Sequence, residues 1–337
     1  MNCSININLK IDHLWVIGAI LFSGLLKAQD SQFTQFYAAP MYLNPALTGE
    51  TSKQRLVANY RNQYSGIAKG FQTYMASYDY NLSAFNSGIG FHVLQDKAGT
   101  GGLTLNQIGF NYAYLIKINS SMKLRFGTNL SYNQQKIDFN KLKFNDQFIT
   151  GSAQSMDAAN FQQNNYLDFS AGSFFSANNY WVGLSLKHMN KPTSSLTGKS
   201  SSLPVTTSFH GGYRFLLENK SDNQIKQHIT AAYHFKHQQK YNQLDVGLYY
   251  FYSPFSVGLW YRGLPIINNI SSYTNSESLA LLIGIDIDKY NMKIGYSYDA
   301  TISSLGISNS LGSHEISLKY EIPEKIVKKT YIVIPKL

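Results

Sequence analysis

The sequence predicts an all-β protein, namely a 14-stranded antiparallel transmembrane β-barrel of the outer-membrane type. Three observations lead to this prediction. Apolar and polar residues alternate with a period of two over long stretches, as in MKIGYSYDA at 292–300. Only 14% of the residues are charged, against roughly 25% in soluble domains, while aromatic residues also make up 14%. The N-terminus has the pattern of a secretory signal.

The first 28 residues are expected to be a signal peptide. Lys10 precedes an apolar stretch at 14–26, which is shorter than the ~20 residues that a membrane-spanning helix needs. The small residue Ala28 follows, and we expect cleavage between Ala28 and Gln29. The single cysteine, Cys3, would leave with the signal, so the mature chain would have no disulfide and no thiol.

Residues 29–53 differ from the rest of the mature chain. They contain Pro40 and Pro45 and show no sustained alternation, which argues against a strand in the barrel wall. Three roles are open for this segment: it plugs the lumen, it faces the periplasm, or it is an ordered leader with a structural role only.

Fourteen predicted strands then occupy residues 54–322, and a C-terminal tail, 323–337, follows them. Most are longer than the five or six residues that are usual in soluble proteins. The predicted strands are 54–64, 72–84, 87–95, 104–117, 122–138, 165–177, 180–190, 206–218, 226–237, 241–252, 254–264, 276–288, 291–300 and 314–322. Tight turns alternate with long polar loops near 139–164, 191–205, 265–275 and 301–313. Long strands, an even count and short turns on one side are typical of transmembrane barrels.

The two faces of the strands differ in chemistry. One face is apolar and nearly free of charge, as lipid contact requires, and the other collects charged residues. The charged residues expected to line the lumen are Arg61, Asp79, Lys117, Arg125, Asp168, Lys187, Arg214, Asp245, Arg262, Asp286, Lys293 and Asp299. The tyrosines expected in the aromatic girdles at the two membrane interfaces are Tyr60, Tyr80, Tyr114, Tyr180, Tyr252, Tyr261 and Tyr298. A soluble β-sandwich or propeller also shows alternation, but it would not need the signal, the long strands and the low charge together.

No catalytic, metal-binding or nucleic-acid-binding pattern stands out. The net charge of +10 comes from scattered residues, so we expect no nucleic-acid partner. His228 and His234 share one strand face while His237 lies on the other, and no zinc-binding spacing occurs. Ser313 and His314 are neighbours in a strand, so their side chains diverge and cannot form a catalytic pair. We therefore expect no enzymatic activity, no metal and no cofactor.

Several stretches match a known family in order along almost the whole mature chain. They include FTQFYAAPMYLNPALTG at 33–49, YRNQYSG at 60–66, IGYSYDATISSLG at 294–306 and GSHEISLKY at 312–320. In these stretches the chain resembles the PorP/SprF family of type IX secretion outer-membrane proteins. The residues that carry the resemblance are Asn44, Pro45, Arg61, Gly295, Tyr296, Ser297, Tyr298, Asp299, Gly312, Ser313, His314 and Glu315.

The resemblance implies a barrel in outer-membrane lipid that has no enzymatic activity and binds other proteins. Its partners would be type IX components, such as a peptidoglycan-binding lipoprotein, or secreted proteins with a C-terminal sorting domain, including gliding adhesins. The chain departs from the family at Tyr64, where a tryptophan is usual, and in its tail, 323–337. The alternative function is an outer-membrane diffusion or solute channel, which a polar lumen permits but which fourteen strands would keep narrow.

Overall fold

A computed structural model describes residues 30–322, with gaps at 52, 69, 100, 139–141, 143, 153–154, 157–162, 197–200, 220–224, 240, 264–276 and 304. The predicted signal peptide, its cleavage site and the predicted tail lie outside these residues. By its internal contacts the chain divides into two units, Met1–Gln32 and Phe33–Leu337, and the second unit contains all the described strands.

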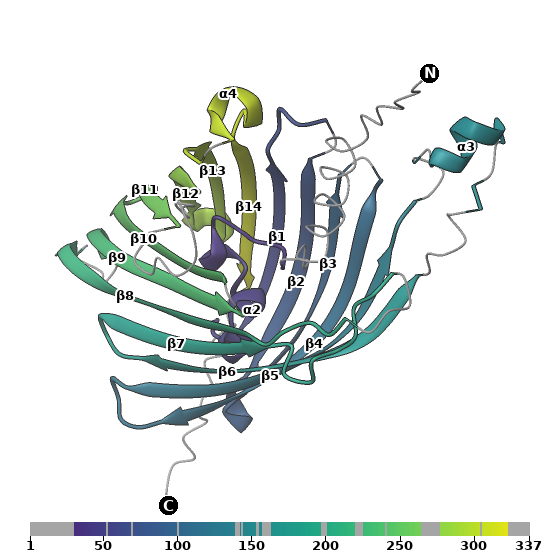
Figure 1. Cartoon of the computed structure of the whole chain (residues 1–337). Coiled ribbons are helices and arrows are strands. Elements are labelled where there is room, and N and C mark those ends of the chain that lie inside the picture. The colour runs from purple at the N-terminus through teal and green to yellow at the C-terminus, as the bar shows by residue number, and fades with distance from the viewer. Residues whose placement is uncertain are drawn as a thin grey trace, which may run out of the picture. The chain divides into compact units, whose positions relative to one another are not determined.

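The described strands form one closed antiparallel barrel in which each strand pairs with its neighbours in sequence and β1 pairs with β14 (Figure 1). The first seven strands are β1 (Gln54–Gln63), β2 (Phe71–Leu82), β3 (Ser87–Ala98), β4 (Leu103–Lys117), β5 (Lys123–Lys136), β6 (Asn164–Ser176) and β7 (Tyr180–Lys187). The others are β8 (Thr206–Asn219), β9 (Ile225–Gln238), β10 (Tyr241–Tyr252), β11 (Phe255–Arg262), β12 (Ser278–Ile287), β13 (Met292–Thr301) and β14 (Ser313–Ile322). The predicted 14-stranded barrel is confirmed, and every predicted strand bound lies within three residues of the observed one.

The strands alternate between a face that points outward and a face that points into the barrel. In β1 the side chains of Val57, Asn59 and Arg61 are buried, whereas Leu56 is 44% exposed. The outward face is apolar, so in a membrane it contacts lipid tails, and the backbone hydrogen bonds are satisfied within the closed sheet. Inside, the buried side chains are mostly polar or charged.

The two ends of the barrel carry different connections. At one end, which we call the short-turn end, tight turns join β2 to β3 and β12 to β13, and Asn86 and Asn291 adopt the left-handed conformation that such turns need. At the other end, the long-loop end, the connections include two short helices, α3 (Asn145–Thr150) and α4 (Gly306–Ser310). The sequence predicts loops at 139–164 and 301–313, and each of them contains one of these helices.

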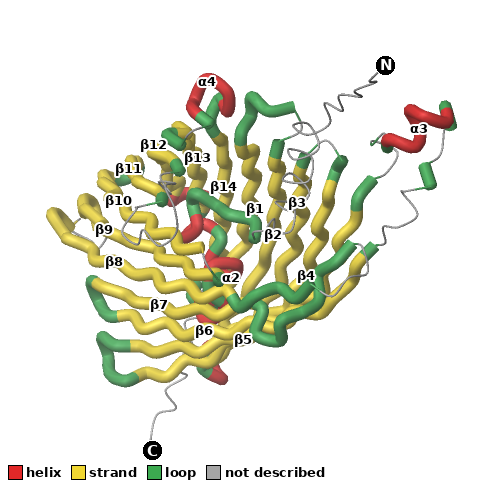
Figure 2. The backbone as a smooth tube through the Cα atoms, in the orientation of Figure 1, coloured by secondary structure: helices red, strands yellow, loops and turns green. Residues whose placement is uncertain are grey.

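The chain before β1 forms short helical turns instead of a strand. They are η2 (Phe36–Ala38), α2 (Pro40–Leu43) and η3 (Pro45–Leu47), which Figure 2 shows in red within the ring of strands. Pro40 and Pro45 each begin a helical turn, where the absence of a backbone N–H costs nothing. Asn44 caps η3, because its side-chain oxygen accepts a hydrogen bond from the Ala46 N–H at 2.9 Å. No helix in the described part of the chain is long and apolar enough to cross a membrane.

Candidate functional site

Residues 33–50, which we call the inner segment, contact the inward-facing side chains of strands on several sides of the barrel. The segment is buried along most of its length, and Asn44, Ala46 and Thr48 are fully buried. Its contacts fall into three groups, at the long-loop end, at mid-height and at the short-turn end.

At the long-loop end two backbone amides of the inner segment bind one carboxylate. Glu315 accepts hydrogen bonds from the Thr34 N–H at 2.6 Å and from the Gln35 N–H at 3.1 Å. The Thr34 hydroxyl donates to Asp299 Oδ2 at 2.6 Å, and Ser317 donates to the Gln35 side-chain oxygen at 2.7 Å. These bonds fix both the backbone and the side chains of Thr34 and Gln35.

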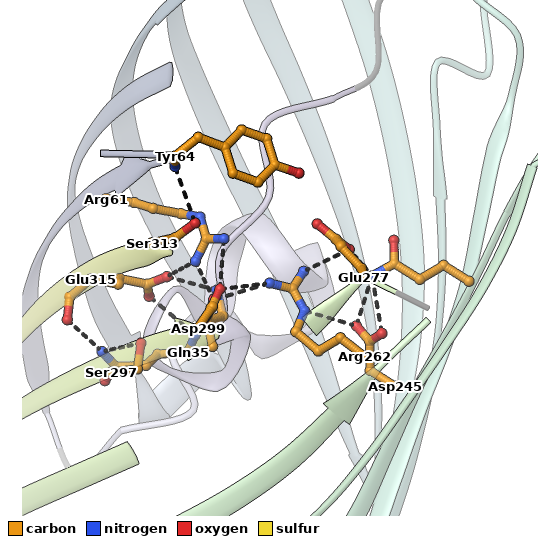
Figure 3. Close-up of polar contacts among 12 residues, drawn as sticks. Gln35, Arg61, Tyr64, Asp245, Arg262, Glu277, Ser297, Asp299, Ser313 and Glu315 are labelled. Atoms are coloured by element: carbon orange, nitrogen blue, oxygen red, sulfur yellow. Dashed lines mark hydrogen bonds and ion pairs between the residues drawn. The ribbon is translucent and has the colours of Figure 1, made fainter. Parts of the chain in front are cut away.

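Two arginines balance the carboxylates, and Figure 3 shows the resulting network. Arg61 contacts Asp299 at 2.8 Å and Glu315 at 3.2 Å. Arg262 contacts Asp299 at 3.2 Å, Asp245 at 3.7 Å and Glu277 at 3.9 Å. We call these six residues the mouth network, since each lies close to a strand end at the long-loop end.

The mouth network is almost entirely withdrawn from solvent. Arg61, Arg262 and Asp299 are each at most 2% exposed, and Glu315 is fully buried. Burying charges costs several kcal/mol for each ion, and attraction within the network offsets this cost only where the geometry is good. The network is therefore weak evidence for stability and stronger evidence that Thr34 and Gln35 have one defined position.

At mid-height Asn44 joins the inner segment to β6, β7 and β8. Its amide nitrogen donates to the backbone oxygens of Ser173 at 3.0 Å and Leu184 at 3.2 Å, and it lies 3.1 Å from His210 Nε2. Lys187 places its ammonium 3.5 Å from the centre of the Tyr42 ring, which is a cation–π contact.

An aromatic contact joins the inner segment to β11. The ring of Phe36 meets Trp260 edge to face at 5.0 Å between centroids. Thus the inner segment contacts β6, β7 and β8 through an amide and a cation–π pair, and β11 through aromatic rings.

At the short-turn end the contacts are again charged. Arg55 binds Asp79 through two hydrogen bonds, of 2.9 and 2.7 Å, and also donates to the Leu47 carbonyl at 3.0 Å. Asp79 accepts from the Gly49 N–H at 2.7 Å. Arg125 donates to the carbonyl oxygens of Thr48 at 3.0 Å and Gly49 at 3.3 Å. A bidentate arginine–carboxylate pair is among the strongest side-chain contacts, so this end is also tightly held.

The predicted lumen-lining residues occupy three environments. Seven are buried: Arg61, Asp79, Arg125, Asp168, Asp245, Arg262 and Asp299. Three are half-buried: Lys187, Arg214 and Asp286. Lys117 and Lys293 are exposed near the short-turn end, where Lys293 pairs with Asp286. Six of the buried members bind the inner segment or one another, whereas Asp168 lies 3.1 Å from His188.

The residues of the family resemblance separate into an inner and an outer group. Arg61, Ser297, Asp299 and Glu315 meet around Thr34 and Gln35, and the Gln35 side chain lies over Gly295. Asn44 and Pro45 lie in the inner segment, and Gly312 and Ser313 are buried at the start of β14. Tyr296 and Tyr298 point the other way and contact His314, the former through a 2.7 Å hydrogen bond.

Sequence reasoning missed Thr34, Gln35, Arg55 and Glu277 as members of these contacts. Arg55 shares the inward-facing parity of Arg61 in β1, so the alternation could have found it. Thr34 and Glu315 are 281 residues apart, and no local pattern predicts such a contact. Within the described residues no group of three His, Cys, Asp or Glu side chains is arranged to hold a metal ion.

Comparisons with known proteins identify the family. In solved structures, similar chains include the outer membrane protein Omp33 of Acinetobacter baumannii, at 8% identity and a TM-score of 0.45, covering 82% of this chain and all of that one. Another is the toluene transporter TodX of P. putida, at 10% identity and a TM-score of 0.46, covering 84% of this chain and 93% of that one. No curated protein matches in sequence. The family model for type IX secretion system membrane proteins of the PorP/SprF group matches residues 25–320. The chain therefore belongs to the PorP/SprF family.

Proposed function

We propose that this barrel acts in the export or surface anchoring of secreted proteins by binding other proteins. Family membership gives the setting, since a type IX secretion membrane protein works with other secretion components. The outer membrane is the location that the barrel fold and the family support. A signal peptide ending near Ala28 would direct the chain there.

The observation that carries the proposal is the occupied interior of the barrel. The inner segment is held at both ends and at mid-height by buried polar contacts. A general diffusion channel needs a continuous aqueous path through the lumen. A buried segment that is held within the lumen obstructs such a path. The function of the barrel then depends on its surfaces, above all the long-loop end, where an exported protein can dock.

Two kinds of partner fit this proposal. One is a secreted protein, such as a gliding adhesin, that carries a C-terminal sorting domain and docks at the long-loop end. The other is a periplasmic or peptidoglycan-linked component, such as a lipoprotein, at the short-turn end. Among the described residues, the long-loop end bears the longer connections, which contain serine, asparagine and threonine and suit adaptable hydrogen bonding.

Affinity purification of the tagged barrel from membranes, followed by mass spectrometry, tests the proposal. We expect recovery of a secreted protein's C-terminal domain or of type IX components, and no recovery with an unrelated outer-membrane barrel of similar abundance. Purification of the barrel without either class of partner, even after crosslinking in cells, would contradict the proposal.

A further inference from the structure

Two lysines stand out on the outward face of the barrel. Lys97 in β3 and Lys136 in β5 are exposed and share the outward-facing side of their strands. Among the strand side chains that the structure describes, every other lysine, arginine, aspartate and glutamate lies on the inward-facing side of its strand. Charge on a lipid-facing surface is costly near the membrane centre and tolerated near the interface. The depth of these two lysines therefore decides what they can bind.

The strand between the two lysines shows their depth. In β4 the outward residues from Ile116 to Ile108 are all apolar or aromatic, and they are 42–61% exposed. This stretch has about the length of nine to eleven residues with which a tilted strand crosses the hydrocarbon core. The next outward residues toward the long-loop end are Asn106 and Thr104. Polar residues thus begin where the lipid tails end and the headgroups are expected.

The two lysines flank Thr104 in one row of the sheet. Lys97 pairs with Thr104, and Thr104 pairs with Lys136, across the adjacent strands β3, β4 and β5 (Figure 1). Two strand spacings, about 10 Å, therefore separate the backbones of the two lysines. Neither lysine forms an ion pair within the described part of the chain. A lysine side chain is long and flexible, so both ammonium groups can reach one anion between them.

A row of three amide side chains lies beside the lysines, on the side nearer the lipid tails. Gln95 donates a hydrogen bond to Asn106 at 2.8 Å, and Asn106 donates to Gln134 at 3.3 Å. The three residues are direct partners across β3, β4 and β5. Because both bonds run in the same direction, the amide nitrogen of Gln134 ends the row, and it donates to no residue that the structure describes. This donor lies on the same face of β5 as Lys136.

We propose that Lys97, Lys136 and the amide nitrogen of Gln134 bind the phosphate group of a membrane lipid. Ammonium groups bind phosphate through their charge, and lysines next to a membrane are attracted to anionic lipid. The acyl chains of the bound lipid lie against the apolar outward residues of β4. In an outer-membrane barrel the long loops face outward, so the lipid belongs to the outer leaflet. The site needs none of the protein partners discussed above and therefore goes beyond the proposed function.

Native mass spectrometry of the purified barrel in a neutral detergent tests this inference. The probe is dioleoyl phosphatidic acid, and the comparison is dioleoylglycerol, which lacks the phosphate. The test variant Lys97→Gln/Lys136→Gln removes both charges, whereas Lys97→Arg/Lys136→Arg keeps them. The matched control is Lys117→Gln/Lys123→Gln. These two lysines are direct partners in β4 and β5, but they lie at the short-turn end and on the inward-facing side of their strands.

We expect the wild-type barrel to bind phosphatidic acid more tightly than dioleoylglycerol. The glutamine variant should bind phosphatidic acid about 10- to 30-fold more weakly, because it loses the attraction of two lysines. The arginine variant and the control pair should keep the wild-type affinity, and slower gel migration after boiling shows that each variant had folded. Equal binding of the two lipids by the wild type would overturn the inference. An unchanged affinity in the glutamine variant, or an equal loss in the control pair, would overturn it as well.

Discussion

Asp299 is the residue on which the mouth network depends most. One of its oxygens is shared by Arg61, Arg262 and the Thr34 hydroxyl. Removal of this charge leaves two buried guanidinium groups with fewer counter-charges, and Glu315 and Asp245 compensate only in part. Uncompensated buried charge is among the most costly defects in a folded protein.

We therefore predict that Asp299→Asn lowers the free energy of unfolding by about 3–5 kcal/mol. Urea unfolding of the barrel in lipid vesicles, followed by tryptophan fluorescence, measures this value. The matched control is Asp286→Asn, since Asp286 pairs with the exposed Lys293 near the rim. The control should change the free energy by less than about 1 kcal/mol. Equal effects of the two variants would contradict the role assigned to the mouth network.

For single residues, the sequence predicted which face of its strand a side chain lies on, but it did not predict which other residues that side chain contacts. Alternation predicted that Arg61, Asp299 and Arg262 face inward, because each lies on the polar side of its strand. It could not predict that they meet, since Arg61 and Asp299 are 238 residues apart and come together only when β14 closes the barrel against β1. No sequence pattern marks Thr34 and Gln35 as binding residues, because their role depends on the carboxylates of Glu315 and Asp299, which are distant in sequence.

At the scale of the strands, the free-energy cost of a charged side chain on the outward face depends on how deep in the membrane the residue lies. Ile283 is 52% exposed on the outward face of β12, and Ile287 is the last residue of the same strand. Both positions face lipid or the membrane interface, but Ile283 is farther from the end of the strand. Arginine is costly near the bilayer centre and tolerated near the interface.

Ile283→Arg is predicted to destabilise the barrel by about 2–4 kcal/mol, and Ile287→Arg by about 0–1 kcal/mol. The same vesicle unfolding assay compares them, and Ile283→Leu serves as the apolar control. If both arginine variants unfold at the same urea concentration as the control, the outward face of β12 does not contact lipid. Gly284, on the inward face, is a poorer site for comparison, because an added Cβ would lie 2.5 Å from Ser256 Oγ.

The strands could be predicted closely because each must satisfy lipid on one side and a polar interior on the other. That requirement imposes a strict period of two over β12 and β13, and the sequence shows it directly. The helical turns of the inner segment and α4 follow no such period. Pro40 and Pro45 argued against a strand at these positions. The strands that the helical turns contact, such as β6, are seen only in the closed barrel.

For the whole molecule, the occupied interior predicts how the barrel behaves as a pore. Arg55, Arg125 and the mouth network hold the inner segment at both ends. We predict that the intact protein shows low conductance in planar lipid bilayers, and that conductance rises when residues 30–50 are deleted. Slower gel migration after boiling, shown for both forms, is the control that each barrel had folded. Large, stable openings in the intact protein would favour the solute-channel function.

We propose that this PorP/SprF barrel serves protein export or anchoring and not solute uptake. The most direct measurement compares the surface and secreted proteomes of a strain lacking the gene with those of the parent and of the complemented strain. We predict that a specific protein leaves the cell surface for the medium, or is no longer exported, and that the wild-type gene restores it. Unchanged surface and secreted proteomes, together with reduced uptake of a small solute, would contradict the claim and support a channel.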